Sequence, residues 1–283
     1  MERTGRIHKL LIALLFAVAM FALSAVEADA AAPVAVDSGT TQWNNGLEYI
    51  VGSDVTIDSP VEVNGSVRLT FMKGAKLTAE HGIHVPDGAK LRIEGTGALI
   101  DKADSGNAGI GAAGKDTGGS VIICKNTASN VTVTAQGGYG AAGIGGSHSK
   151  DYYGSVEIGG GRVIAIGGGG AAGIGSGYGC DCYGSITISG GTVSASSSLN
   201  NAGNGGTGIG SGATGSLYSS ITIRGGEVTA EGGAHSAGIG SGYMANASGA
   251  TINISGGTVT ATGKDDAAGI GGGEEGDWPF YDG

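Results

Sequence analysis

Short apolar segments recur along this 283-residue chain with a period of about 30 residues. A motif of the form A/T-G-I-G places an isoleucine at the same point of each unit, at Ile110, Ile144, Ile174, Ile209, Ile239 and Ile270. A second motif, S-I-T-I-x-G-G-x-V-x-A, begins at Ser155, Ser185 and Ser220, with a close copy at Thr251. Self-similarity at this period is typical of a repeat architecture in which each unit stacks on the next.

Each unit contains three β-capable pieces, I-T-I, V-T-A and A-G-I-G, and none is longer than about five residues. The Gly-Gly and Gly-Ser-Gly turns between them need the positive φ angles that glycine tolerates. Strands this short are stable only when each pairs with the same strand in the units above and below. The pattern therefore predicts an all-β parallel β-helix (β-solenoid) with about one coil per 30-residue repeat, in which the motif Ile and Val side chains stack inward.

The first 30 residues have the pattern of a secretory signal peptide. Basic residues up to Lys9 precede an unbroken apolar run from Leu10 to about Val26, and small residues surround a cleavage point after Ala30. The alternative is a retained membrane anchor, but a run of about 17 residues is at the short limit for crossing a bilayer. No second run of that length follows. We therefore predict a secreted or extracellular protein, free or associated with the cell wall, with no integral membrane span after signal removal.

The rest of the chain divides into four segments. Residues 31–47 are predicted to form a leader, and residues 48–100 alternate apolar and polar positions in the manner of two or three entry coils. Glycine-rich repeats occupy residues 101–273. Because solenoid ends normally need a cap, the tail at 274–283 either folds over the last coil or marks a truncated chain.

Composition agrees with this architecture and removes several classes of function. Glycine accounts for 61 residues but does not recur at every third position, so neither an ordinary helical domain nor collagen fits. With 15 basic and 25 acidic residues the net charge is −10, so nucleic acid is not an expected partner. Cys124, Cys180 and Cys182 make an odd count that implies no disulfide framework, and we expect free or incidentally paired thiols.

The repeated A-G-I-G-S-G followed by S-I-T-I-S-G-G-T-V-x-A resembles the right-handed β-helix repeats of large secreted and cell-wall proteins of Gram-positive bacteria. Those proteins are often described as carbohydrate-binding or adhesin-like. The resemblance covers most of residues 48–273 and implies a β-helix at the bacterial surface. It implies no catalytic residue, because these repeats share no catalytic motif and a fold does not define an activity.

Tyrosines recur at two equivalent positions after the repeated isoleucine. Nine residues beyond it stand Tyr153, Tyr183 and Tyr218, and four residues beyond it stand Tyr178 and Tyr243. If the coils stack in register, the first three form an aromatic column that could serve as a platform for the apolar faces of sugar rings. The alternative is that these rings only stack on one another and hold the glycine-rich loops in place.

Two carboxylates lie in the same loops. Asp151 and Asp181 each follow their isoleucine by seven residues, so adjacent coils would bring them within about 5 Å of each other. Such a pair could bind Ca²⁺, the one cofactor that the sequence suggests, or act as the acid and nucleophile of a retaining glycosidase. It could also simply face water.

Two functions from different classes remain open. The small share of charged residues and the repetitive surface favour a non-enzymatic exported protein. Such a protein would bind polysaccharide or another glycan, or would serve as an adhesin stalk. The alternative is a β-helix polysaccharide lyase or glycoside hydrolase, which would need several acidic or basic groups on one face of a few coils. Basic residues are few in 101–283 and most fall at unmatched positions, which makes an enzyme the weaker interpretation.

Overall fold

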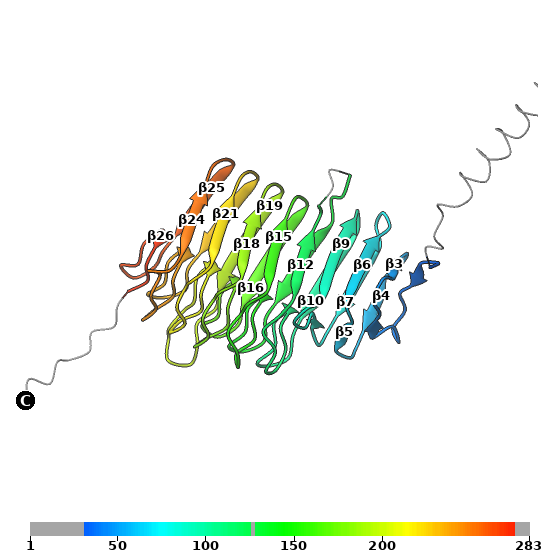
Figure 1. The fold of residues 1–283 in the computed structure, drawn as a ribbon, viewed down its shortest axis with the longest axis horizontal. Helices are drawn as coiled ribbons and strands as arrows, with labels where there is room; N and C mark the ends of the chain where they lie inside the picture. The colour runs from blue at the N-terminus through cyan, green and yellow to red at the C-terminus, as the bar shows by residue number, and fades with distance from the viewer. Residues whose placement is uncertain (1–30, 126–127, 275–283) are drawn as a thin grey trace, which may run out of the picture. The chain divides into compact units, whose positions relative to one another are not determined.

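The computed structural model describes residues 31–125 and 128–274. All regular elements in this part of the chain are strands, and they form three sheets in which every strand pairs with its neighbours in parallel. Figure 1 shows successive coils lying side by side from the N-terminal blue strands to the C-terminal red ones. The parallel β-helix predicted from the repeats is confirmed.

Each coil after the first contributes one strand to each sheet, and the first coil contributes β1 and β2 only. The first sheet contains β1 (Val34–Ala35), β3 (Glu48–Val51), β6 (Ser66–Phe71), β9 (Lys90–Gly95), β12 (Ser120–Ile123), β15 (Ser155–Ile158), β18 (Ser185–Ile188), β21 (Ser220–Ile223) and β24 (Thr251–Ile254). The second contains β4 (Val55–Ile57), β7 (Lys76–Ala79), β10 (Ala98–Lys102), β13 (Thr132–Gln136), β16 (Arg162–Gly167), β19 (Thr192–Ser197), β22 (Glu227–Glu231) and β25 (Thr258–Thr262). The third contains β2 (Gln42–Trp43), β5 (Val61–Val63), β8 (Ile83–His84), β11 (Ile110–Gly111), β14 (Ile144–Gly145), β17 (Ile174–Gly175), β20 (Ile209–Gly210), β23 (Ile239–Gly240) and β26 (Ile270–Gly271).

The register of the strands places equivalent motif residues over one another. Ile144 pairs with Ile174, and Ile174 pairs with Ile209, although the intervening unit carries five additional residues. That insertion is accommodated in the corner between β19 and β20. Leu99 stands 11 residues before Ile110, which is the spacing of the motif Val, and it pairs with Val133 as that spacing predicts. The same column also continues back through Leu77 to Val55, so it starts before Leu99.

The interior of the stack is built from ladders of identical side chains. The motif isoleucines from Ile110 to Ile239 are fully buried, and burial of each contributes about 2 kcal/mol. In the last described coil, Ile254 and Ile270 are 39% and 47% exposed, because no further described coil covers them. Stacking on a neighbour is therefore what buries each repeat.

The coil stack begins earlier than the sequence indicated. Val34 in β1 pairs with Tyr49, and Gln42 in β2 pairs with Glu62, so part of the expected leader at 31–47 already belongs to the sheets. Trp43 is fully buried, with its ring stacked on Tyr49 at a centroid distance of 5.7 Å. This segment has no motif of the later repeats, which is why the pattern alone did not place it. The predicted signal peptide at 1–30 and residues 275–283 of the tail lie outside the described residues.

The second glycine of each G-I-G motif explains why this motif forms a tight corner. Gly145 and Gly175 have φ angles of +135° and +141°, in the region that favours glycine. A Cβ added at Gly145 would lie 2.1 Å from the carbonyl oxygen of Gly175, and one at Gly175 would lie 1.8 Å from that of Gly210. The coils thus approach one another at a distance that only glycine permits.

The three cysteines are free and buried. Burial raises the pKa of Cys180 to about 11 and that of Cys182 to about 12, so both thiols stay protonated at neutral pH. Protonated, buried thiols are poor nucleophiles and poor metal ligands, which indicates a packing role.

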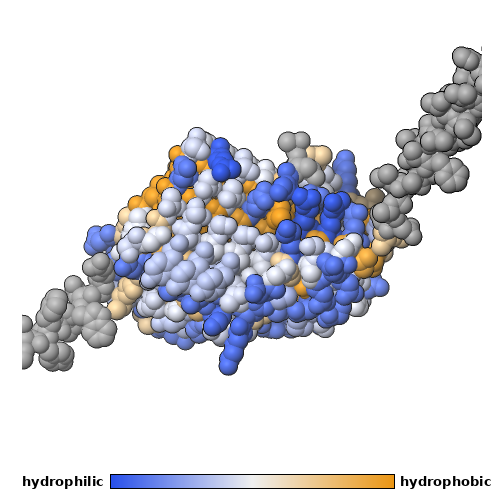
Figure 2. Space-filling model, viewed as in Figure 1, coloured by the Kyte–Doolittle hydropathy of each residue, from blue (hydrophilic) through white to orange (hydrophobic). Residues whose placement is uncertain are grey.

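The hydropathy of the surface differs between the N-terminal coils and the glycine-rich coils. Figure 2 shows strongly hydrophilic residues gathered over the N-terminal coils, whereas the glycine-rich coils have a paler surface of near-neutral hydropathy. No helix in residues 31–125 and 128–274 is long and apolar enough to cross a membrane.

Candidate functional site

Tyr153, Tyr183 and Tyr218 form one stacked column on the outside of the coils. The residues just before them, Tyr152, Cys182 and Leu217, pair with one another between coils and point into the core, so the tyrosines that follow point outward. The ring centroids of Tyr153 and Tyr183 lie 4.7 Å apart with an interplanar angle of 11°. The corresponding values for Tyr183 and Tyr218 are 5.0 Å and 10°. The structure thus brings together the three tyrosines that the spacing predicts as a column.

Tyr153 has the most exposed ring of this column. Both faces of Tyr183 are covered by its two neighbours. At the other end of the column, Gly249 approaches one edge of the Tyr218 ring, where an added Cβ would lie 2.5 Å from Cδ1. Tyr153 has an aromatic neighbour on one side only, and its 55% exposure exceeds the 40% of Tyr183 and the 41% of Tyr218.

The open face of Tyr153 is free because the two preceding coils have glycine at the equivalent position. Ser155 pairs with Ser120, and Ser120 pairs with Lys90. Two residues before each of these stand Tyr153, Gly118 and Gly88, so the tyrosine column ends where two side chains are missing.

An open groove of about 420 Å³ occupies this place and spans four coils. Its lining consists of Asp87, Gly88, Ala89, Lys90, Gly118, Gly119, Ser120, Tyr153, Gly154, Ser155, Tyr183 and Ser185. Lys90 and the three serines stand at successive positions of the first sheet, and the hydroxyl of Ser155 donates to the Oγ of Ser120 at 2.8 Å. The volume lies within the range of small-molecule sites, and the glycines let a ligand ring approach the backbone.

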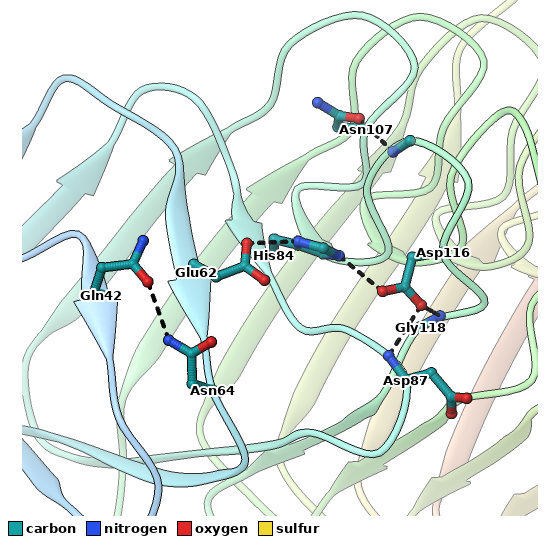
Figure 3. A network of polar contacts seen from close by, with 9 residues as sticks. Gln42, Glu62, Asn64, His84, Asp87, Asn107, Asp116 and Gly118 are labelled. Atoms are coloured by element: carbon teal, nitrogen blue, oxygen red, sulfur yellow. Dashed lines mark hydrogen bonds and ion pairs between the residues drawn. The ribbon is translucent and has the colours of Figure 1, made fainter.

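A polar network holds two lining residues of the groove in place, Asp87 and Gly118, which we call its floor (Figure 3). His84 lies between two carboxylates, with Nδ1 2.7 Å from Glu62 and Nε2 3.1 Å from Asp116. The other oxygen of Asp116 accepts the backbone N–H groups of Asp87 and Gly118, each at 3.0 Å. Asp116 therefore joins the two loops that line the groove next to Tyr153.

Sequence reasoning missed this network because its members do not recur. Glu62, His84 and Asp116 are 22 and 32 residues apart along the chain, so they follow neither a local motif nor a constant period. Aligning β5, β8 and β11 in the third sheet would have placed Glu62 beside His84. That alignment can be made only when the lengths of the entry coils are known.

Tyr178 and Tyr243 do not join the column or the groove. They share one position of the coil, but the buried Ala213 occupies that position between them. Tyr178 contacts His148 edge-on at a centroid distance of 5.7 Å, and Tyr243 contacts His235 at 5.2 Å. Tyr178 therefore belongs to one aromatic cluster, with His148 and Tyr139, and Tyr243 belongs to another, with His235.

Asp151 and Asp181 lie on adjacent coils as predicted, and their carboxylates bind backbone. Asp151 Oδ1 accepts the N–H of Asp181 at 2.9 Å, and Asp181 Oδ1 accepts the N–H of Ser216 at 2.8 Å. The hydroxyl of Tyr183 donates to the second oxygen of Asp181 at 3.2 Å. The two aspartates thus tie consecutive loops together beneath the tyrosine column. No group of three or more His, Cys, Asp or Glu side chains suited to a metal ion occurs in the described part of the chain.

A second histidine bridge lies nearby in the entry coils. His81 Nδ1 is 3.0 Å from Asp104, and His81 Nε2 is 3.0 Å from Asp58. Hydrogen bonds to Asp104 and Asp58 raise the pKa of His81 above its usual value of 6.5.

Replacing His81 by Gln is expected to destabilise the protein at acidic pH and to have little effect at alkaline pH. A raised folded-state pKa means that the stabilising contribution is complete below about pH 6.5 and is lost as the pH rises through the pKa of the folded protein. Urea unfolding of both proteins from about pH 5 to pH 8.5 measures this difference, and an NMR titration of His81 locates its pKa. A difference in stability that stays constant across this pH range would contradict the bridge.

Comparison with known families supports the fold. A family model described as a beta helix repeat matches residues 132–148, 221–243 and 252–274. The second match extends from β21 to β23, which is one coil. No curated protein and no solved structure gives a significant match. The family match, in these three stretches, and the three parallel sheets together show a parallel β-helix built from repeats.

Proposed function

We propose that this protein is an exported, non-enzymatic β-helix that binds carbohydrate in the groove beside the tyrosine column. The observation that carries the proposal is the open ring face of Tyr153 at the end of a groove of about 420 Å³. Sugar rings present apolar C–H faces that pack on aromatic rings, while their hydroxyl groups need polar partners close by. Ser120, Ser155 and Ser185 supply such partners along the same groove.

Two features of the sequence support an exported location. The basic, apolar and small-residue regions of 1–30 have the order found in secretory signal peptides. The resemblance of the repeats to those of Gram-positive surface proteins suggests the cell wall or the extracellular space. At such a place the stack of coils would hold the groove on a rigid support. The same stack could serve as the stalk of an adhesin.

A lyase or hydrolase receives less support from the same site. The carboxylates of Asp151 and Asp181 each accept a backbone N–H of the following loop, an arrangement that serves to stabilise the coils. The groove itself has one carboxylate among its described lining residues, Asp87, whereas glycoside hydrolysis ordinarily uses two.

Binding of the mature protein, residues 31–283, to a glycan array tests the proposal. We expect the Tyr153→Ala/Tyr183→Ala double variant to lose about tenfold in affinity, because the ring face is removed. The double variant is needed because Tyr153→Ala alone would uncover the face of Tyr183. Tyr139→Ala is the matched control, since Tyr139 is an exposed tyrosine that packs on His148 outside the groove.

The array is read with and without Ca²⁺ so that a role of Asp151 and Asp181 in ion binding is detected. Equal binding by the double variant would place the sugar elsewhere. A blank array from a protein with an all-β circular dichroism spectrum would refute carbohydrate binding and leave the stalk as the better function.

A further inference from the structure

We infer that the groove is selective for a neutral saccharide whose ring stacks on the open face of Tyr153, at the level of Gly118. This inference rests on the proposed function and specifies its ligand. It follows from the spacing of the column, from the rigidity of the groove floor and from the charges on the groove wall.

The spacing of the column leaves room for one more ring. Adjacent coils are separated by about 4.8 Å, and the tyrosine rings repeat at 4.7 and 5.0 Å. Gly118 stands one coil before Tyr153 and presents no side chain, and Gly88 stands one coil further. A ligand ring at the level of Gly118 would therefore stack on Tyr153 at the distance at which Tyr183 stacks on its other face.

The floor beneath this position is held by hydrogen bonds within the protein. Asp116 fixes the backbone of both Asp87 and Gly118 and is itself bonded to His84. The buried ring of Tyr152 lies directly under Gly118, where an added Cβ would meet it at 2.8 Å. A ligand that binds here does not have to order the loops, which lowers the entropic cost of binding.

The charged side chains that line the groove have a net charge of zero. Among its described lining residues only Lys90 and Asp87 are charged, and the others are glycine, alanine, serine and tyrosine. Lys90 forms no ion pair with any described residue. Its ammonium group can donate hydrogen bonds and the Asp87 carboxylate can accept them, while serine hydroxyls do both. This set complements the hydroxyl groups of a neutral sugar, which also donate and accept.

An anionic sugar fits the same surroundings less well. A uronic acid would bring its carboxylate near that of Asp87, and the net charge of −10 repels anions at longer range. Two further cations, Arg68 and Arg92, stand on β6 and β9, but both face Glu94, at 3.9 and 3.6 Å. Their charge is therefore partly balanced before a ligand arrives.

Calorimetric titration of the mature protein with neutral and acidic sugars tests the inference. The probes are tetramers of glucose, galactose and mannose, compared with tetramers of glucuronic and galacturonic acid. We expect a neutral tetramer to bind more tightly than its acidic counterpart, with less than a twofold change in affinity between low and high NaCl.

Asp87→Ala and Lys90→Gln should each weaken neutral binding about fivefold, because each removes a hydrogen-bond partner. Lys102→Gln should leave the affinity for the neutral tetramer unchanged, because Lys102 is exposed on β10 and does not line the groove.

Two results would overturn the inference, and they are distinguishable from failure of the proposed function. Tighter binding of acidic tetramers, lost in Lys90→Gln and weakened by salt, would replace a neutral ligand by an anionic one and leave carbohydrate binding intact. Failure of every neutral tetramer to bind would also overturn it. The proposed function falls as well only if the glycan array is blank.

Discussion

Replacing Gly175 by Ala is expected to destabilise the coil stack by about 3–5 kcal/mol. Gly175 has a φ of +141°, which an L-residue adopts only with strain. The new Cβ would also lie 1.8 Å from the carbonyl oxygen of Gly210, so the two coils would have to move apart. Because each coil is buried by its neighbours, such a shift would weaken the sheet pairing and the isoleucine ladder on both sides. Urea unfolding followed by circular dichroism measures the loss.

Two glycines of the same chain provide matched controls. Gly271 ends the last G-I-G motif and has a φ of +139°, but an added Cβ there would meet only the Ala268 side chain, at 3.3 Å. Gly271→Ala should therefore show the backbone strain alone, about 1–2 kcal/mol. Gly52 has no positive φ, and its nearest contact would be Met72 Sδ at 3.7 Å, so Gly52→Ala should be nearly neutral. Equal losses for Gly175→Ala and Gly271→Ala would show that close approach of the coils is not the cause.

The repeats made most of the fold predictable from the sequence. Identical residues at a constant spacing determine which strands pair, because only one register buries all the isoleucines together. This is why the spacing predicts both the pairing of Leu99 with Val133 and the column of Tyr153, Tyr183 and Tyr218. The same reasoning was weaker in residues 31–100, where coil lengths are shorter and no motif repeats.

The groove depends on the points at which the repetition stops. Recurring residues predicted the tyrosine column, but the open face of Tyr153 exists because Gly88 and Gly118 interrupt that column. The network of His84 and Asp116 that holds the floor likewise occurs once. A search for repeated residues therefore finds the coils and the tyrosines of the site. The lining residues from the entry coils, such as Asp87 and Gly88, can be placed only when those coils are aligned in space.

Asp101 interrupts another ladder, and here the interruption costs stability. It points into the core from β10, in register with Ala79 and Ala135, and the later coils continue with alanine at this position. The side chain is buried, and neither carboxylate oxygen has a hydrogen-bond partner among the described residues. Burial, reinforced by the nearby charge of Glu80, raises the pKa of Asp101 well above its usual range. A buried polar group without a partner destabilises a fold by about 1–3 kcal/mol even when it is uncharged.

Asp101→Ala is therefore expected to stabilise the protein by about 2–3 kcal/mol at pH 7. The gain should depend on pH in a defined direction. Above about pH 4 the unfolded chain releases the proton of Asp101 while the folded protein keeps it, so the wild type loses stability as the pH rises towards the folded-state pKa. Asp101→Ala lacks this loss, and its advantage in urea unfolding should be larger at pH 7.5 than at pH 4.5. Asp101→Asn separates the two contributions, because it removes the titration but keeps a buried polar group, so it should gain less than the alanine variant. An advantage of Asp101→Ala that is the same at both pH values would mean that Asp101 does not titrate differently on folding.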